Sequence, residues 1–358
     1  MKLPHRFLLA AALIPLYVQA AETGFTIEQS PRKLDIRVGG KPFASYVLDD
    51  ANKPYLWPVY GPTGKAVTRD YPMQDNARED KAQRDHPHHR GITFGHESIG
   101  GGAWRFPQKW DAITGEERHT EGADTWHEKR TFEEFLQQPK NALRGKQRLP
   151  MLGTIQHRSF TTTHADASHA VVIEELDYLA ASGQRYLAER RTLTFRVLAD
   201  SRAIDIDQVF TASDFDVRFD DRKDAGLSIR VPSSMAVDSK KGGRIINSEG
   251  LADKDAWGKP ARWCDYNGPV DDETLGIAFL NHPSSLRFPT RWHVRTYGLF
   301  SANPFLQHDA DTNLPEAPVL LKKGQQTALH HRLLLHVGNE KSADIEAQWK
   351  AYADAPTQ

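Results

Sequence analysis

Short stretches in which apolar and polar residues alternate recur along almost the whole chain. Leu34, Ile36 and Val38 alternate with polar residues near the start. The 193–197 and 204–206 stretches follow the same pattern. Because the side chains of a strand point alternately to its two faces, this pattern predicts half-buried β-strands. The continuous apolar run Leu275–Leu280 predicts a strand buried on both faces, and Ala328–Val337 predicts a further core strand.

Turn and helix signals complete this expectation. Gly39 and Gly40 separate two alternating stretches and predict an N-terminal hairpin. Helical periodicity is weak around Thr131–Leu143, within the polar region 116–148. It is clear only at the C-terminus, where residues 345, 349 and 352 form one apolar stripe behind a cap at Ser342. We therefore expect an all-β fold, a large antiparallel β-sandwich of two packed sheets, with a short C-terminal helix.

The first twenty residues have the three regions of a secretory signal peptide. Lys2 and Arg6 are basic, Phe7–Val18 is a short apolar run, and Ala20 ends a small-residue cleavage signal. We expect residues 1–20 to be removed, residues 21–358 to form a single β-sandwich domain, and the protein to be periplasmic or secreted. Cys264 is the only cysteine, so no intramolecular disulfide can form.

Charge and hydropathy exclude several kinds of partner. The chain has 46 basic and 47 acidic residues, a formal net charge of -1 and a mean hydropathy of -0.60. A nucleic-acid-binding surface requires an excess of basic residues, so we expect no nucleic-acid partner. The apolar run Phe7–Val18 is too short for a transmembrane helix, so we expect no membrane span.

Histidines are concentrated in one segment. Four of the 16 histidines fall between His86 and His96, in DHPHHRG from Asp85 to Gly91 and the FGH that follows. Imidazole suits both proton transfer near neutral pH and metal ligation. In an extended segment His86 and His88 would share one face and His89 would lie on the other. A loop whose histidines only bond to neighbouring polar groups is the structural alternative.

Two further regions combine aromatic and polar residues. The turn-rich segment Leu56–Tyr71 carries aromatic rings beside Arg69, a combination that suits a ligand with hydroxyls and apolar ring faces. Near the C-terminus, His293, Arg295 and Tyr297 would share one face of a strand, with Trp292 opposite. A row of polar side chains on a sheet favours a cleft over core packing.

These segments resemble a known family. The matching stretches are YLWPVYGPTGKAVTRDYP from Tyr55 to Pro72, DHPHHRGITFGH from Asp85 to His96, and the WCDY, NHPSS, FPTRWHVRTYG and NPF segments between Trp263 and Phe305. They resemble the bacterial secreted family labelled PmoA-like, whose members are found in carbohydrate-degrading organisms. The label refers to a membrane-bound methane monooxygenase subunit, which the hydropathy of this chain excludes. The resemblance implies a galactose-mutarotase-like supersandwich that acts on sugars, and it carries no established catalytic residues.

The favoured hypothesis is an enzyme that acts on a carbohydrate by hydrolysis, elimination or epimerisation, with imidazole and carboxylate groups in acid and base roles. A carbohydrate-binding protein without activity and a metal-dependent hydrolase using His86 and His88 are the alternatives. No cofactor is predicted beyond the metal of that last alternative. The candidate catalytic residues are His88, His89 and Glu189. The candidate substrate-binding residues are Tyr60, Arg69, His86, Arg90, His96, Asp265, His282, His293 and Arg295.

Overall fold

The computed structural model describes residues 24–75, 78–101, 108–111, 116–120 and 122–357. The predicted signal peptide, residues 1–20, lies outside these ranges. Among the helices that the structure describes, none is long and apolar enough to cross a membrane.

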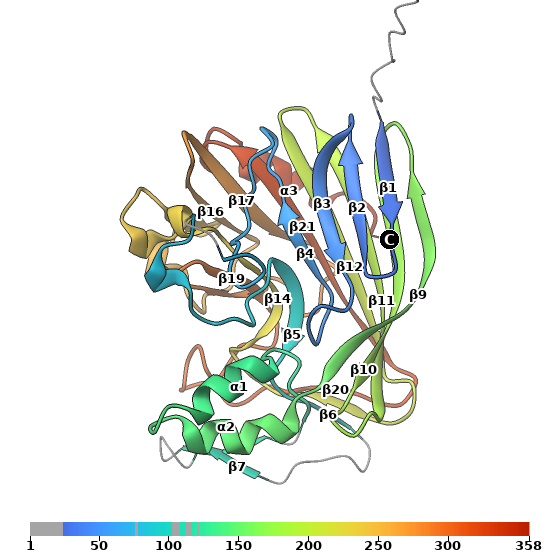
Figure 1. The fold of residues 1–358 in the computed structure, drawn as a ribbon, viewed down its shortest axis with the longest axis vertical. Helices are drawn as coiled ribbons and strands as arrows, with labels where there is room; N and C mark the ends of the chain where they lie inside the picture. Colours follow the sequence, from blue (N-terminus) through green and yellow to red (C-terminus); the bar gives the residue numbers. More distant parts are fainter. Residues whose placement is uncertain (1–23, 76–77, 102–107, 112–115, 121, 358) are drawn as a thin grey trace, which may run out of the picture.

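The described residues form two large sheets in which neighbouring strands pair antiparallel (Figure 1). The first sheet has the order β1 (Phe25–Gln29), β2 (Lys33–Val38), β3 (Lys41–Val47), β4 (Tyr55–Val59), β5 (Ile92–His96), β14 (Ala225–Arg230), β19 (Leu299–Asn303) and β18 (Arg291–Val294). The second has the order β15 (Arg244–Asn247), β16 (Trp263–Val270), β17 (Glu273–Asn281), β21 (Gln326–Val337), β12 (Ser201–Thr211), β11 (Arg185–Leu198), β10 (His169–Leu179) and β9 (Thr154–Ala165). The expected all-β sandwich, with the Gly39–Gly40 hairpin between β2 and β3, is confirmed.

Smaller elements surround the two sheets. A three-stranded sheet contains β20 (Val319–Leu321), β13 (Val217–Phe219) and β6 (Ile99–Gly101), and β7 (Gln108–Asp111) pairs with β8 (Glu116–Thr120). The α-helices are α1 (Lys129–Leu136), α2 (Ala142–Arg148) and α3 (Ile345–Ala353). Short 3-10 helices span Lys81–Gln83, Leu149–Met151, Ser233–Met235, Val237–Ser239 and Asp253–Ala256.

The core lies between the two sheets. Phe43 of the first sheet meets Phe195 of the second with ring centroids 5.5 Å apart, and Phe94 meets Phe210 at 5.0 Å. Cys264 is a buried free cysteine in the same core. Because side chains alternate along each strand, the residues between these core positions face outward.

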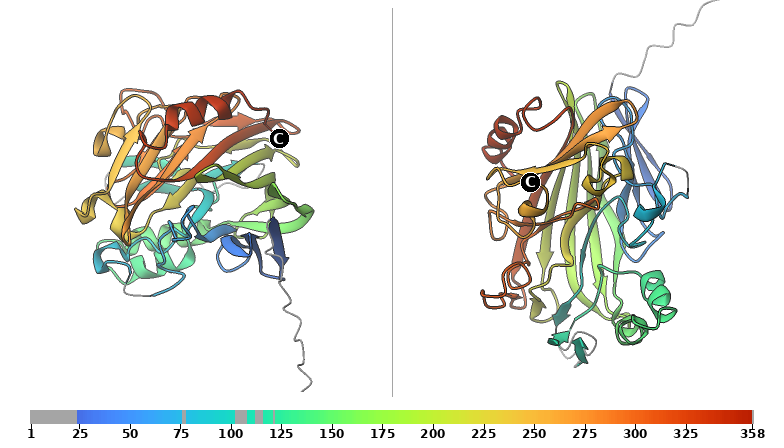
Figure 2. Two further views of the ribbon diagram at one scale, coloured as in Figure 1. Left: turned by 90° about the horizontal axis from the view of Figure 1, so that it is seen from above. Right: turned by 90° about the vertical axis from the view of Figure 1, so that its left-hand side faces the viewer.

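The outer faces of the two sheets are covered differently. Figure 2 shows α3 on the outer face of the second sheet, and α1 and α2 on the opposite side of the molecule. Ile345 and Tyr352 of α3 are buried against the second sheet, as the apolar stripe predicts. The cap is Asp344, whose side chain accepts from the backbone N–H of Ala347; the expected cap, Ser342, lies in the preceding turn and bonds to Asn339.

Candidate functional site

The DHPHHRG segment is a tight loop that leads into β5. The chain turns at Pro87 and His88, and His86 has a φ of 45°, so the segment is not extended. The rings of His86 and His89 stack at 4.9 Å, and the His88 ring lies 4.4 Å from that of His89. The expected alternation of these side chains between two faces is therefore wrong, because the turn gathers the three rings into one cluster.

Two buried arginines hold this loop from below. The guanidinium of Arg69 donates to the carbonyl oxygens of Gln83 and Asp85 (both 2.8 Å), His86 (2.9 Å) and His89 (3.1 Å). Arg230, from β14, donates to the Asp85 carboxylate at 2.7 Å and to Nδ1 of His89 at 3.2 Å. Arg69, a candidate substrate ligand from the sequence, is fully buried and positions the loop instead.

The end of β18 and the turn after it form a second wall, which carries the three predicted residues although only His293 lies in the strand. Trp292 points into the core, whereas His293, Arg295 and Tyr297 line a cavity beside the loop. His293 donates its Nδ1–H to the carbonyl oxygen of Lys223 at 2.6 Å. The Tyr297 ring stacks on that of His86 at 5.5 Å. The two histidine-bearing segments, far apart in the sequence, therefore meet at one site.

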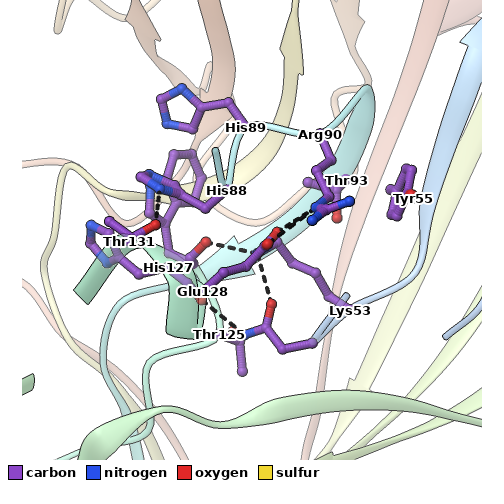
Figure 3. A network of polar contacts seen from close by, with 12 residues as sticks. Lys53, Tyr55, His88, His89, Arg90, Thr93, Thr125, His127, Glu128 and Thr131 are labelled. Atoms are coloured by element: carbon purple, nitrogen blue, oxygen red, sulfur yellow. Dashed lines mark hydrogen bonds and ion pairs between the residues drawn. The ribbon is translucent and has the colours of Figure 1, made fainter. Parts of the chain in front are cut away.

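A third wall carries a histidine that the sequence analysis missed. His127 precedes α1 and donates its Nδ1–H to Asp124 at 2.9 Å, and its ring lies 4.6 Å from that of His88 (Figure 3). Asp124 is fully buried and also bonds to Arg148. The segment packs directly on β5 at Gly95, where an added Cβ would lie 2.9 Å from the Thr125 carbonyl oxygen. The available sequence signal was the Asp-x-x-His spacing at 124–127, in a region without strand periodicity.

These walls enclose a cavity of about 610 Å³, which we call the imidazole cavity. It lies between α1 and the β18 end of the first sheet, and its volume falls within the range of about 300–1,000 Å³ usual for small-molecule sites. Its lining comprises residues 85–89, Trp126, His127, Thr131, Glu134, Phe135, Gln138, Arg144, Lys223, Asp224, His293, Arg295 and Tyr297.

All five imidazoles of the cavity are held by the protein through Nδ1. The partners are Asp85 for His86 (2.6 Å), Thr131 for His88, Arg230 for His89, Asp124 for His127 and the Lys223 carbonyl for His293. No Nε2 atom of the five has a hydrogen-bond partner among the described residues. The protein thus orients each ring and leaves its second nitrogen for a ligand.

The Nδ1 partners also fix where the proton lies on four of the rings. Asp85, Asp124 and the Lys223 carbonyl can only accept, so His86, His127 and His293 carry the proton on Nδ1 when neutral and present a lone pair at Nε2. Arg230 can only donate, so His89 accepts at Nδ1 and presents an N–H at Nε2. The cavity therefore offers proton acceptors and a fixed donor side by side.

Burial keeps three of these rings neutral. Burial and the neighbouring basic groups lower the pKa of His88 and of His89 well below the ordinary imidazole value. Burial lowers the pKa of His293 to about 4, although the Asp224 carboxylate opposes that shift. The pKa of Asp224 is itself lowered: burial raises it, but Lys223 and His293 outweigh burial. At neutral pH the cavity thus holds neutral imidazoles beside an ionised carboxylate.

Several other predicted residues lie near the imidazole cavity without lining it. Arg90 pairs with Glu128 at 2.9 Å and with Asp50 at 3.1 Å (Figure 3). His96 is fully buried, accepts from the backbone N–H of Ser98, and packs on Phe305. Tyr60 pairs through its backbone with Ala66. The structure therefore does not bring Arg90, His96 or Tyr60 to the cavity.

Three predicted residues lie in the second sheet or directly after one of its strands, and all three bond within the protein. Glu189 is buried, with its carboxylate held by Arg191 at 2.7 Å, Tyr178 at 2.6 Å and Gln208 at 2.9 Å. Asp265 accepts from His336 at 2.9 Å. His282 bonds to Ser284 at 2.7 Å and donates to the carbonyl oxygen of Ala355 beyond α3. Each of these side chains therefore has a structural partner within the fold, and none of the three lines the imidazole cavity.

Metal ligation was one alternative for the histidines. Within the ranges that the structure describes, no group of three or more His, Cys, Asp or Glu side chains is arranged to hold a metal ion. The two histidines of that alternative, His86 and His88, have ring centroids 5.7 Å apart and direct their Nδ1 atoms to Asp85 and Thr131.

The fold and the cavity define a class: antiparallel β-sandwich proteins with a histidine-lined cavity between a helix and one sheet. The chain belongs to a family of unknown function (DUF6807), whose model matches residues 33–350. The family description does not include the PmoA-like label. A search of curated proteins finds no match.

Solved structures with similarity to this chain include carbohydrate-active proteins. An alpha-galactosidase from Lactobacillus brevis has 8% identity and a TM-score of 0.39 over 91% of this chain and 41% of its own. A galactose mutarotase-like protein from Clostridium acetobutylicum has 9% identity and a TM-score of 0.35 over 88% of this chain and 98% of its own. A polysaccharide lyase has 11% identity and a TM-score of 0.32 over 90% and 34%. The chain thus spans about two fifths of the length of the alpha-galactosidase.

Proposed function

We propose that this protein is a carbohydrate-active enzyme that moves protons with the histidines of the imidazole cavity. The observation that carries the proposal is the set of five imidazoles, each fixed through Nδ1 with Nε2 left for a ligand. A binding protein gains little from oriented titratable groups, whereas proton transfer requires them at fixed positions. The proposal covers hydrolysis, elimination and epimerisation, which share this need.

The lining of the cavity suits a sugar. Trp126, Phe135 and Tyr297 supply flat apolar faces for the C–H faces of a sugar ring. Asp224 and the imidazole nitrogens supply acceptors and donors for hydroxyl groups. The resemblance to PmoA-like secreted proteins and the predicted signal peptide agree with a periplasmic or secreted enzyme of sugar metabolism, and both stay predictions.

His127 is the best base in the cavity. Its Nε2 carries the lone pair, and the buried Asp124 carboxylate stabilises the imidazolium that forms when Nε2 takes a proton. His89, which presents an N–H from a neutral ring, is placed to donate a hydrogen bond to a substrate oxygen as negative charge develops there. His88 lies between them, with its ring 4.4 Å from that of His89 and 4.6 Å from that of His127.

The test compares His127→Ala with His157→Ala on a panel of oligosaccharides, with products detected by mass spectrometry. His157 also bonds to a carboxylate, Glu174, but lies on β9 and does not line the cavity. We expect His127→Ala to lower kcat by about 10²–10⁴-fold, the usual contribution of a general acid or base, and His157→Ala to leave kcat unchanged.

Other outcomes would contradict the proposal. Unchanged turnover in His127→Ala would show that His127 is not the general base. Sugar binding without turnover of any sugar would favour the binding-protein alternative. Loss of activity on chelation, restored by one equivalent of metal, would favour the metal-dependent alternative.

A further inference from the structure

Two cations of the imidazole cavity, Arg295 and Lys223, form no ion pair with a carboxylate of the described residues, and Lys223 acts on the neighbouring Asp224 through its charge alone. Neither Arg295 nor Lys223 forms an ion pair or a side-chain hydrogen bond with any residue that the structure describes. Arg69, Arg230 and Arg148, which surround the same cavity, are each bonded to a carboxylate. The lining therefore contains two cations whose hydrogen-bond donors are available to a ligand.

Both cations are held in place by contacts that do not use their donors. The guanidinium carbon of Arg295 lies 5.8 Å from the ring centroid of Trp257 and 5.6 Å from that of Tyr297. Stacking engages the faces of the guanidinium and leaves its N–H edges free. The backbone of Lys223 is fixed by its N–H bond to Asp309 at 2.9 Å and by its carbonyl, which accepts from His293. Only the ammonium end of its side chain stays uncommitted.

The charges of the lining leave a positive excess. Of the three carboxylates, Asp85 is bonded to Arg230 and Arg69, and Glu134 is bonded to Arg130 at 2.9 Å. Asp224 alone has no Lys or Arg within ion-pair distance among the described residues, and the nearest ring nitrogen is Nδ1 of the neutral His293 at 3.9 Å. Arg295 and Lys223 thus face this one carboxylate, and the neutral rings of His88, His89 and His293 add no charge.

We propose that the imidazole cavity binds an acidic sugar, whose carboxylate or sulfate group is held by Arg295 and Lys223. This inference rests on the proposed function in that it takes the ligand to be a sugar. The N–H edge of a guanidinium forms paired hydrogen bonds with the oxygens of either anion, and the ammonium group adds a second charge. The sugar ring then lies toward His88, His89 and His127, on the other side of the cavity.

The experiment measures binding by calorimetry with matched pairs of oligosaccharides. One pair is an oligogalacturonate and its carboxyl-reduced form, a second is an oligoglucuronate and its carboxyl-reduced form, and a third is a sulfated galactan oligosaccharide and its desulfated form. We expect at least one acidic member to bind about 10- to 100-fold more tightly than its neutral partner, the usual strength of a hydrogen bond to a charged group. The pair that shows this preference identifies the anion.

Arg295→Gln and Lys223→Gln test the assignment to residues. Each should remove most of the preference for the acidic member and leave the Kd of the neutral member unchanged. The matched control is Arg262→Gln, because Arg262 also stacks on a ring, that of Trp349 at 4.8 Å, but does not line the cavity. Circular dichroism spectra and unfolding temperatures show whether each variant is folded.

The binding measurements separate this inference from the proposed function. Equal affinity for acidic and neutral members in all three pairs would overturn the inference, as would an unchanged preference in both cavity variants. Turnover of a neutral sugar with no acidic preference would overturn the inference and support the proposed function. Selective binding of an acidic sugar without turnover would support the inference and contradict the proposed function.

Discussion

The ring of His89 does two different things with its two nitrogens. Nδ1 accepts from Arg230 and so belongs to the packing beneath the loop, whereas Nε2 carries the N–H that faces the imidazole cavity. Asn places an acceptor near the position of Nδ1, and Gln places an N–H donor near that of Nε2. The structural and the chemical role of this one residue can therefore be separated.

We expect His89→Asn to keep the free energy of unfolding and to lower kcat by about 10²–10³-fold, the usual effect of removing a donor to a developing oxyanion. His89→Gln should retain more of the activity but lower the free energy of unfolding by about 1–3 kcal/mol, because a buried Arg230 N–H loses its acceptor. Urea unfolding and turnover are measured on both variants. Equal losses of activity in the two would contradict the division of roles.

At the scale of elements, most of the hydrogen bonds that hold the backbone of the loop 85–91 come from Arg69, while Arg230 bonds to two of its side chains. Arg69 satisfies four backbone carbonyls of this loop and of the short helix before it, and no other side chain type has five donors in one plane. We expect Arg69→Met to lower the free energy of unfolding by about 3–5 kcal/mol and to raise amide hydrogen exchange across residues 83–90. The control is Arg32→Met, since Arg32 is 67% exposed and forms an exposed ion pair with Asp49. Unchanged exchange in the loop of Arg69→Met would show that other contacts determine its shape.

The elements also show how far the sequence could predict the site. The sequence placed His293, Arg295 and Tyr297 on one wall correctly, and strand alternation holds for Trp292 and His293, but Arg295 and Tyr297 follow the end of β18 and reach the wall from the turn before β19. The cluster of His86, His88 and His89 could be located in sequence, but its shape could not, since the turn depends on Arg69 from a distant segment. Asp124 and His127 were missed because they lie in an irregular connection, where no periodicity reports on orientation.

Other residues were predicted for the site but do not line the imidazole cavity: Glu189, Asp265 and His282. Each is a polar residue in or beside a strand, a position that favours a functional site when no partner is known. Their partners Arg191, His336 and Ser284 belong to the fold itself. Such pairings depend on strand register and side-chain packing, which the pattern of a single sequence does not specify.

For the whole molecule, the buried histidines predict sensitivity to acid. Burial lowers the pKa of His96 to about 3, of His331 to about 3 and of His293 to about 4, whereas an unfolded chain titrates its histidines near 6.5. Between these values the unfolded state binds more protons, so stability falls as the pH falls. His336 partly offsets the effect: burial opposes its protonation, but Asp265 outweighs burial and raises its pKa.

We expect the free energy of unfolding to decrease from pH 6.5 to about pH 4, by up to about 1.4 kcal/mol per pH unit for each such histidine. Urea unfolding at a series of pH values measures the slope. His331→Gln removes one of these groups. It should lower the slope of the free energy against pH by the contribution of one proton, about 1.4 kcal/mol per pH unit. A free energy that stays constant between pH 7 and pH 5 would mean that these histidines are protonated in the folded state.

The imidazole cavity is built from four stretches of chain that are brought together only by folding: the loop at 85–89, the segment at 126–144, residues 223–224 and the end of β18. No part of it exists in the unfolded chain, so a ligand that enters it binds the folded state alone. Mass action then adds about 2.7 kcal/mol to stability at a ligand concentration 100-fold above Kd. Melting temperature is therefore a direct measure of occupancy, and a library of sugars can be ranked by heating the protein with each, before any reaction is known.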